Sequence, residues 1–541
     1  MFAPQNQQPN VIDSMSGSME EWYNAIDEAV KKSDVIPGNY EYTVATSYGN
    51  VGKISEDSST YFDITCDRFK VISLDNSYIT IEQSLSINAP DPTANSKYDF
   101  NTYYIGYKYA ADVIDQYRIY SNTDLIQTQN HARYEWYMLY NSVSDEAKEN
   151  SDLYATLHKI RTMNPNVPGV YVDISSLNAS HPITVQLKLR IPLSSFLTLF
   201  NLRFYPNWSG KLSIEVYPSY KNLVVAPVLK ESFVESDLFQ TLAKNKDYTE
   251  LNVGFVNINM PAVNGIHGVG GPPRTSYTAH TQTFTCNGTD CYADKCKVRL
   301  ATYLLKMDVF NALAAKYIQV PLIFPIQTVQ IKDFTDPLPK AEGHFTTANT
   351  LALKHCDAMF VVFRQSEYAR TCFFNPHITF QFNVDGKFYP REQCTSVEDE
   401  RTLNMTLDAL NINNSLLSSI SKDLRTSLQP YAITYGYGAG GGAITGRTKV
   451  YNADDYSNFM IGVPFADSED FMGGISTTGT VQIELSGEKL DVANIKALDF
   501  KATAICFEDS LLKIRAVKPD SRPQIEITHA TIDQLIAGAA I

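Results

Sequence analysis

The chain has 541 residues, and because single hydrophobic cores stop growing well below this length we expect two or more domains. Its 33 Tyr and 27 Phe, beside only 19% charged residues, favour half-buried β-strands over long helices. The net charge of -14 argues against broad, non-specific binding to phosphate backbones, which depends on many Lys and Arg, while leaving room for a local basic patch.

The sequence shows no sign of a membrane span or an export signal. No segment approaches the roughly 20 apolar residues that cross a bilayer, and residues 1–18 lack the charged-then-apolar order of a secretory signal. We therefore expect a soluble protein that is made inside the cell. Glycosylation stays open, since the sequons carry little weight without an export signal; they stand at Asn178, Asn207, Asn287, Asn404 and Asn413.

Residues 1–37 are predicted to form an N-terminal arm and a short amphipathic helix. The arm, 1–17, is rich in Gln, Pro, Asn and Ser, and Ser18 with Glu21 forms a capping-box pattern. One apolar face follows at helical spacing, made of Trp22, Ile26, Ala29 and Val30. The favoured interpretation is a helix docked on its own domain; the alternative is a helix that touches a neighbouring subunit or an internal membrane.

Residues 38–258 are predicted to form a first β-sandwich. Short runs rich in β-branched and aromatic residues are separated by Gly, Asn, Asp and Ser, and the run 181–193 alternates apolar and polar residues as a half-buried strand does. A long insertion is predicted at 99–165, with a helical pattern over 145–163.

Residues 259–297 are crowded with Gly, Pro and Cys, and we expect them to connect the two domains. Cys286, Cys291 and Cys296 are spaced C-x4-C-x4-C with His280 upstream, a set that could supply four ligands to zinc. Structural zinc sites more often bring their ligands as two close pairs, so a plain loop is favoured over a zinc site or a disulfide. The other five cysteines are scattered, at Cys66, Cys356, Cys372, Cys394 and Cys506.

Residues 298–525 repeat the architecture of the first half and are followed by a tail at 526–541. Asp385-Gly386 between alternating apolar residues predicts a tight hairpin. A second long insertion is predicted at 396–457, helical at its start and glycine-rich at its end. The fold class is thus mainly β, with two antiparallel eight-stranded sandwiches of jelly-roll or related topology.

No segment carries a catalytic or cofactor signature. Gly441, Gly446, Arg447 and Thr448 come close to a phosphate-binding loop, but the required lysine is replaced and no helical pattern follows, so we expect a surface loop. The neighbours His355 and Cys356 would point to opposite faces of a strand, and the acidic segment 467–470 is typical of a solvated turn. We therefore predict no catalytic, cofactor-binding or metal-binding residues, and no enzyme.

Several stretches, taken together, are similar to major capsid proteins of the double jelly-roll lineage, most of all those of polintons, polinton-like viruses and virophages. The resemblance follows strand pattern and short phrases over most of residues 40–525. It is carried by "YYIGYKYAADVIDQYRIYSNTDLIQTQNHARYEWYMLYNS" (103–142), "VQLKLRIPLSSFLTLF" (185–200), "GKLSIEVYP" (210–218), "DAMFVVF" (357–363), "ITFQFNVDGKFYP" (378–390), "FADSEDFMGGISTTGTVQIELS" (465–486) and "KATAICFED" (501–509).

The resemblance implies a double jelly roll, with two sandwiches side by side. Three copies would form a homotrimeric, nearly six-fold capsomer, and capsomers would tile the icosahedral capsid of a double-stranded DNA virus or virus-like element. It further implies neighbouring capsomers, penton and minor or cement proteins as partners, contact of the N-terminal segment with an internal membrane, and a place in the virion after assembly inside the host cell. No specific binding of nucleic acid is expected. The alternatives are a carbohydrate-binding or carbohydrate-cleaving β-sandwich protein and, more weakly, a minor capsid or spike component.

Overall fold

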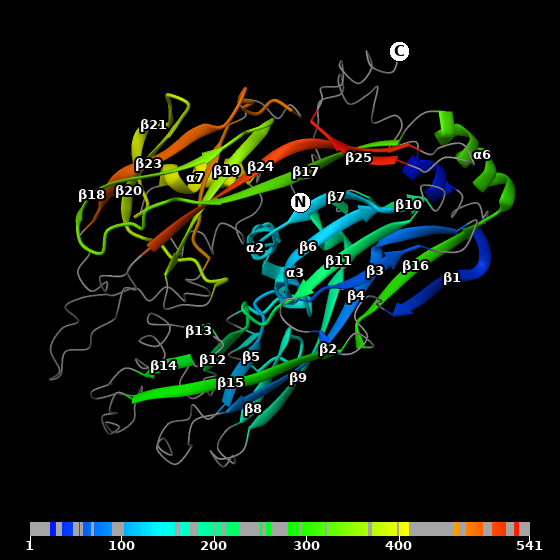
Figure 1. Ribbon diagram of the computed structural model, residues 1–541, viewed down its shortest axis with the longest axis horizontal. Coiled ribbons are helices and arrows are strands. Elements are labelled where there is room, and N and C mark those ends of the chain that lie inside the picture. Colours follow the sequence, from blue (N-terminus) through cyan, green and yellow to red (C-terminus); the bar gives the residue numbers. More distant parts are fainter. Residues whose placement is uncertain are drawn as a thin grey trace, which may run out of the picture.

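The computed structural model describes residues 22–28, 35–46, 53–54, 58–65, 70–88, 102–143, 145–156, 159–160, 163–173, 182–199, 202–206, 211–227, 249–250, 256–260, 280–292, 295–319, 322–365, 370–397, 400–410, 458–465, 472–490, 500–515 and 524–529. Antiparallel strands dominate these residues and gather into two halves that follow one another along the chain (Figure 1).

The first half is a sandwich of two sheets. One contains, in spatial order, β1 (Val35–Thr46), β16 (Lys297–Leu305), the long β4 (Lys70–Asn88) and β9 (Ile183–Pro192). The other contains β3 (Thr60–Ile64), β11 (Leu212–Pro218), β6 (Ile114–Ser121) and β7 (Asp124–Gln129). Alternating apolar residues of both sheets fill one core, as the period-two pattern requires.

The second half repeats this arrangement. Its sheets run β17 (Leu322–Asp333), β24 (Phe500–Arg515), β19 (Cys356–Gln365), β22 (Ile461–Pro464), and β18 (Gly343–Leu351), β23 (Val481–Lys489), β20 (Ile378–Val384), β21 (Lys387–Thr395). The eight strands of the first half, in chain order, are β1, β3, β4, β6, β7, β9, β11 and β16, and those of the second half are β17 to β24. Numbered 1 to 8 within each half, the strands lie in the spatial orders 1-8-3-6 and 2-7-4-5 in both halves. This order is that of a jelly roll, so the predicted fold class is confirmed.

The hairpin between β20 and β21 turns at the two residues that the sequence indicated. Asp385 has φ 51° and Gly386 has φ 80°, and Val384 pairs with Lys387. Both positive angles belong to a two-residue turn whose twist matches that of the flanking strands. The hairpin prediction is confirmed.

The predicted connector needs correction at its C-terminal part. Residues 280–292 form β15 (His280–Tyr292), which continues the line of β16 along β4 and pairs Cys291 with Gln83. Short strands β2 (Lys53–Ile54), β10 (Phe204–Pro206) and β14 (Val256–Met260) extend the same sheet. Helix α6 (Met307–Gln319) is the element between the two jelly rolls in the chain. The Thr-rich and aromatic composition of 280–292 carried this strand signal, which the nearby Gly and Pro residues obscured. The predicted limits of the two jelly rolls, 38–258 and 298–525, also need correction, because β1 begins at Val35 and β16, which ends at Leu305, belongs to the first jelly roll.

The predicted insertion at 99–165 also needs correction, because it contains two core strands, β6 and β7. Around them lie the 3-10 helix η2 (Ala110–Val113) and helices α2 (Arg133–Asn141) and α3 (Asp145–Asn150), so the helical pattern over 145–163 yields a shorter helix than expected. A small sheet gathers the connecting segments: β13 (Thr249–Glu250), β12 (Val224–Pro227), β5 (Thr102–Gly106) and β8 (Gly169–Asp173).

In the second insertion, α7 (Glu400–Ala409) forms where the sequence predicted a helix, and its buried side chains join the core of the second jelly roll. The rest of the second insertion, residues 411–457 with the glycine run, lies outside the described residues, as does the acidic segment 467–470. The further β-strand β25 (Gln524–Thr528) pairs with β24 and crosses the predicted limit between the second jelly roll and the tail at 526, so this limit needs correction as well.

The N-terminal helix is docked on its own domain. Residues 22–28 are helical, and Trp22 and Ile26 are fully buried in the first core. The Trp22 indole Nε1 donates to the Phe204 carbonyl at 3.1 Å, and the Tyr23 ring meets that of Phe204 edge-on at 6.3 Å. For these residues the favoured interpretation is confirmed.

Candidate functional site between the two jelly rolls

Helix α2 lies where the two jelly rolls meet (Figure 1). Trp136 and Tyr140 belong to the core of the first half, whereas Tyr134, Tyr137 and Met138 belong to the core of the second. The sequence RYEWYMLYN is apolar or aromatic on nearly all sides, which is typical of a helix buried all round. The sequence carries that signal, although the segment falls within the predicted insertion 99–165.

The first jelly roll holds α2 through Trp136 and Glu135. The Trp136 indole donates to the Ile114 carbonyl at 3.1 Å and stacks on the Tyr117 ring at 5.8 Å between centroids. The Glu135 carboxylate accepts from the Tyr117 hydroxyl at 2.8 and 3.0 Å. It also accepts from the Leu197 backbone N–H at 2.8 Å. Burial raises the pKa of Glu135 to about 7 although these donors oppose the shift.

The second jelly roll holds α2 through Tyr137. Its hydroxyl donates to the Phe459 carbonyl at 3.1 Å, and its ring lies 4.4 Å from that of Phe373. Beside it the buried Lys108 ammonium donates to the Asn458 side chain, and Lys108 lies 5.8 Å from the centre of the Tyr137 ring. A residue of the first half thus makes a charged hydrogen bond to the second half away from bulk water, where such bonds are strongest.

A chain of polar side chains crosses the same contact. Arg133 Nη1 donates to Asp115 Oδ1 at 3.2 Å, and Arg133 Nη2 donates to the Tyr134 hydroxyl at 3.4 Å. The Tyr134 hydroxyl lies 3.2 Å from Thr503 Oγ1, which itself donates to Asp333 Oδ1 at 2.7 Å. Because the one Thr503 proton is used on Asp333, Tyr134 must donate to Thr503. Donation therefore runs in one direction, from Arg133 in the first half to Asp333 in the second.

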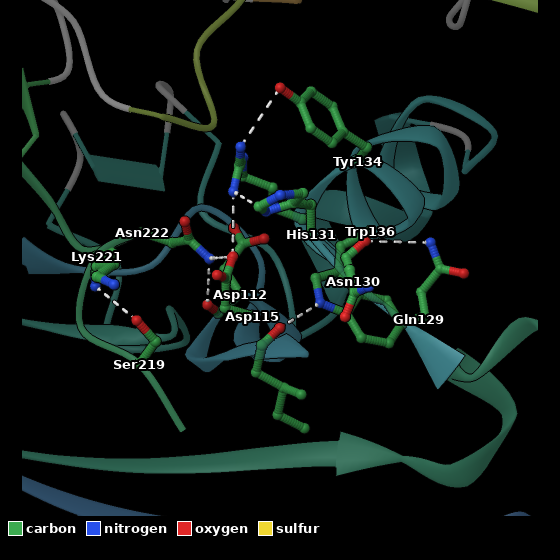
Figure 2. Close-up of polar contacts among 12 residues, drawn as sticks. Asp112, Asp115, Gln129, Asn130, His131, Tyr134, Trp136, Ser219, Lys221 and Asn222 are labelled. Atoms are coloured by element: carbon green, nitrogen blue, oxygen red, sulfur yellow. Dashed lines mark hydrogen bonds and ion pairs between the residues drawn. The ribbon is translucent and has the colours of Figure 1, made fainter. Parts of the chain in front are cut away.

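Asn222 and Asp112 support the first-half end of this chain (Figure 2). The Asn222 amide donates to the Asp112 carbonyl at 2.9 Å and lies 3.5 Å from Asp115 Oδ1. The Asp112 carboxylate accepts from the Tyr109 backbone N–H at 3.0 Å. Burial raises the pKa of Asp112 to about 7, while that hydrogen bond and the neighbouring Lys108 and Arg133 act in the opposite direction.

A smaller apolar cluster makes a second contact between the halves. Tyr104 and Val224 of the small sheet pack with Ile160 and with Cys372 of the segment that follows β19. All four are fully buried. The two jelly rolls are therefore joined at two places by residues that water does not reach.

Those candidate chemical residues of the sequence whose side chains the structure describes are not brought together into a site. Cys296 is fully buried, and Cys286 and Cys291 lie in β15 with side chains outside the described part of the structure. That these cysteines form neither a zinc site nor a disulfide therefore stays a prediction. His355 turns its ring nitrogens toward the Met472 and His529 carbonyl oxygens, at 3.2 and 3.1 Å, and not toward Cys356. Within the described residues no three His, Cys, Asp or Glu side chains are placed to hold a metal ion. None of the helices in that part of the chain is long and apolar enough to cross a membrane.

The fold is similar to that of a viral capsid protein of known structure. The mavirus major capsid protein superposes with a TM-score of 0.52 at 10% identity, over 93% of this chain and 92% of that one. A structure of the Sputnik virophage gives a TM-score of 0.47 at 10% identity, over 93% and 91% of the two chains. The Faustovirus major capsid protein gives 0.40 at 8% identity, over 87% and 90%. No family model matches the chain, and no curated protein matches it. The chain has the double jelly-roll fold of the mavirus protein, and the resemblance noted in the sequence is confirmed at the level of the fold.

Proposed function

We propose that this chain is a structural, non-enzymatic protein, the major capsid protein of a double-stranded DNA virus or virus-like element. The single observation that carries the proposal is the match to the mavirus major capsid protein, which extends over nearly the whole of both chains. Fold alone does not assign function, but here the match covers 93% of this chain and 92% of the mavirus protein and therefore includes both jelly rolls.

The contact between the jelly rolls supports the same proposal. A subunit that tiles a shell must keep its two halves in a fixed orientation, since any relative motion of the halves would be repeated in every copy of the subunit. Here α2 is anchored in both cores, and directional hydrogen bonds of Tyr137 and Lys108 fix its position against the second half. Three such chains carry six sandwiches of equal topology, which is the geometry that a nearly six-fold homotrimeric capsomer needs.

In this proposal the partners are two further copies within the capsomer, neighbouring capsomers, and penton and minor or cement proteins. The N-terminal arm before Trp22 reaches neighbours or an internal membrane, while the helix itself remains in its own domain. The protein is assembled inside the host cell and resides in the virion.

Size-exclusion chromatography with light scattering tests the proposal, followed by electron microscopy of the purified protein. We expect a mass three times that of the chain and particles with a pseudo-hexagonal outline. A protein that stays monomeric at micromolar concentration would argue strongly against a capsomer.

A further inference from the structure

His131 stands at the turn between β7 and α2 in a backbone conformation that few non-glycine residues adopt. Its φ is 55°, in the left-handed region that non-glycine residues enter at a cost of order 1 kcal/mol or more. The turn holds the ring next to the guanidinium of Arg133, with His131 Nδ1 3.3 Å from Arg133 Nη1. An unfavourable backbone angle that places a titratable ring at an interface calls for a functional explanation.

The pairing with Arg133 fixes the protonation state of the ring. A guanidinium has only donors, so Nδ1 of His131 must be the acceptor of this hydrogen bond. The ring is then neutral and carries its proton on Nε2. A second proton on Nδ1 would remove the acceptor and place two cations 3.3 Å apart.

The charged groups that face His131 come from both jelly rolls. They are Arg133 in α2, Asp115 in β6, Asp333 in β17 and Arg370 in the segment after β19. Burial lowers the pKa of His131, Arg133 and Arg370 act in the same direction, and Asp115 and Asp333 oppose them. The neutral ring is therefore the form that suits the assembled contact.

We propose that His131 is an acid-sensitive switch in the contact between the two jelly rolls. In its neutral form the ring accepts a hydrogen bond from Arg133 and keeps the guanidinium aligned with Asp115 and Tyr134. The Tyr134 hydroxyl in turn donates to Thr503 in the second half, and the Thr503 hydroxyl donates to Asp333. Uptake of a proton by His131 repels Arg133, breaks the alignment and loosens α2 from the second jelly roll. The switch depends on this contact and not on the proposed capsid function.

The sign of the effect follows from linkage. A base whose pKa is lowered on folding contributes stability that is present above its ordinary pKa and is lost as the pH falls. Glu135 and Asp112, whose pKa values burial raises to about 7, contribute in the opposite sense, because they favour the folded state more as they become protonated. The pH dependence of wild-type stability alone would combine the titrations of His131, Glu135 and Asp112. The test therefore compares the wild type with variants at each pH.

His131→Asn is the informative variant. Asn tolerates a left-handed φ better than most residues, its Oδ1 takes the position of the imidazole Nδ1 as acceptor, and it does not titrate. The matched control is His344→Asn, which removes an exposed histidine from β18 in the second half. Hydrogen exchange of α2 and β22 in the full-length protein, measured from pH 7 to pH 5, reports the opening of the contact.

We expect the opening constant of the wild type, divided by that of His131→Asn at the same pH, to rise as the pH falls, by up to about tenfold per pH unit. The ratio of wild type to His344→Asn should stay constant. A constant ratio for His131→Asn, or an equal change for both variants, would overturn the proposal.

A second variant keeps the test decisive if His131→Asn fails to fold. Arg370→Gln removes one cation that disfavours the imidazolium. Protonation of His131 should therefore cost less in the closed contact of this variant, and α2 should open at a lower pH than in the wild type. An unchanged or higher opening pH would count against the switch.

Discussion

Replacing Glu135 by Gln should stabilise the protein above pH 7 and leave it nearly unchanged at pH 5. The carboxyl is buried, and its pKa rises from 4.5 to about 7 on folding. A raised pKa means that its contribution to stability is fully present below about 4.5 and is lost as the pH rises through about 7. At ~1.4 kcal/mol for each unit of pKa, the ionised Glu135 costs about 3 kcal/mol of folding free energy at pH 8.

Glutamine keeps the shape of the site without the charge. Its Oε1 can still accept from the Leu197 N–H and from the Tyr117 hydroxyl, so neither of these buried donors loses its acceptor. Urea unfolding followed by tryptophan fluorescence at pH 5, 6, 7 and 8 measures the gain, with Glu146→Gln on the exposed face of α3 as control. A Glu135→Gln protein that is equally destabilised at every pH would show that the ionised carboxylate is needed and that the reasoning is wrong.

Three other predictions concern the N-terminal segment, the contact and the cysteines. Deleting residues 1–17 should leave the oligomer intact in light scattering but impair shell assembly. Trp22→Ala, which empties a fully buried position, should lower the free energy of unfolding in urea by about 3–5 kcal/mol. A deletion that destabilises the protein as much as Trp22→Ala would contradict the distinction between a dispensable arm and a helix that belongs to the core. Tyr137→Phe should cost about 1 kcal/mol, since it removes only the hydrogen bond to the Phe459 carbonyl and keeps the ring; unchanged stability would mean that water replaces the hydroxyl. Elemental analysis of the purified protein should find no zinc, and one bound zinc per chain that is lost in a Cys286→Ser, Cys291→Ser variant would contradict this prediction.

The sequence predicted the parts of this fold that depend on local chemistry. Period-two alternation identified strands such as β9 and β20, and Asp385-Gly386 identified the hairpin turn, because both features act within a few residues. It did not predict which connecting segments carry core strands, since β15 acquires its role only by pairing with β4, some 200 residues away in the chain.

The candidate site was missed for the same reason. Nothing in the neighbourhood of Arg133 indicates that Asp115, Thr503 and Asp333 will converge on it, because Thr503 and Asp333 come from β24 and β17 of the other jelly roll. The helix itself could have been found, since Trp136 and Tyr140 are spaced i, i+4 and Tyr134, Tyr137 and Met138 are spaced i, i+3, i+4. Two apolar faces on one short helix indicate an element buried between two cores, a pattern that can be searched for in other chains of this architecture.

The buried polar groups of the contact bear on orientation more than on stability. Apolar packing between α2 and the second core is non-directional, so by itself it would tolerate small rotations of one jelly roll against the other. The bonds of Tyr137 to Phe459, Lys108 to Asn458 and Tyr134 to Thr503 point in different directions and cannot all be kept after a rotation. Because an unmade buried hydrogen bond costs about 1–3 kcal/mol, each one penalises misalignment even where its net contribution to folding is small. Substitutions that remove these bonds in pairs, such as Tyr137→Phe with Tyr134→Phe, should therefore widen the range of orientations seen by X-ray scattering before they unfold either jelly roll.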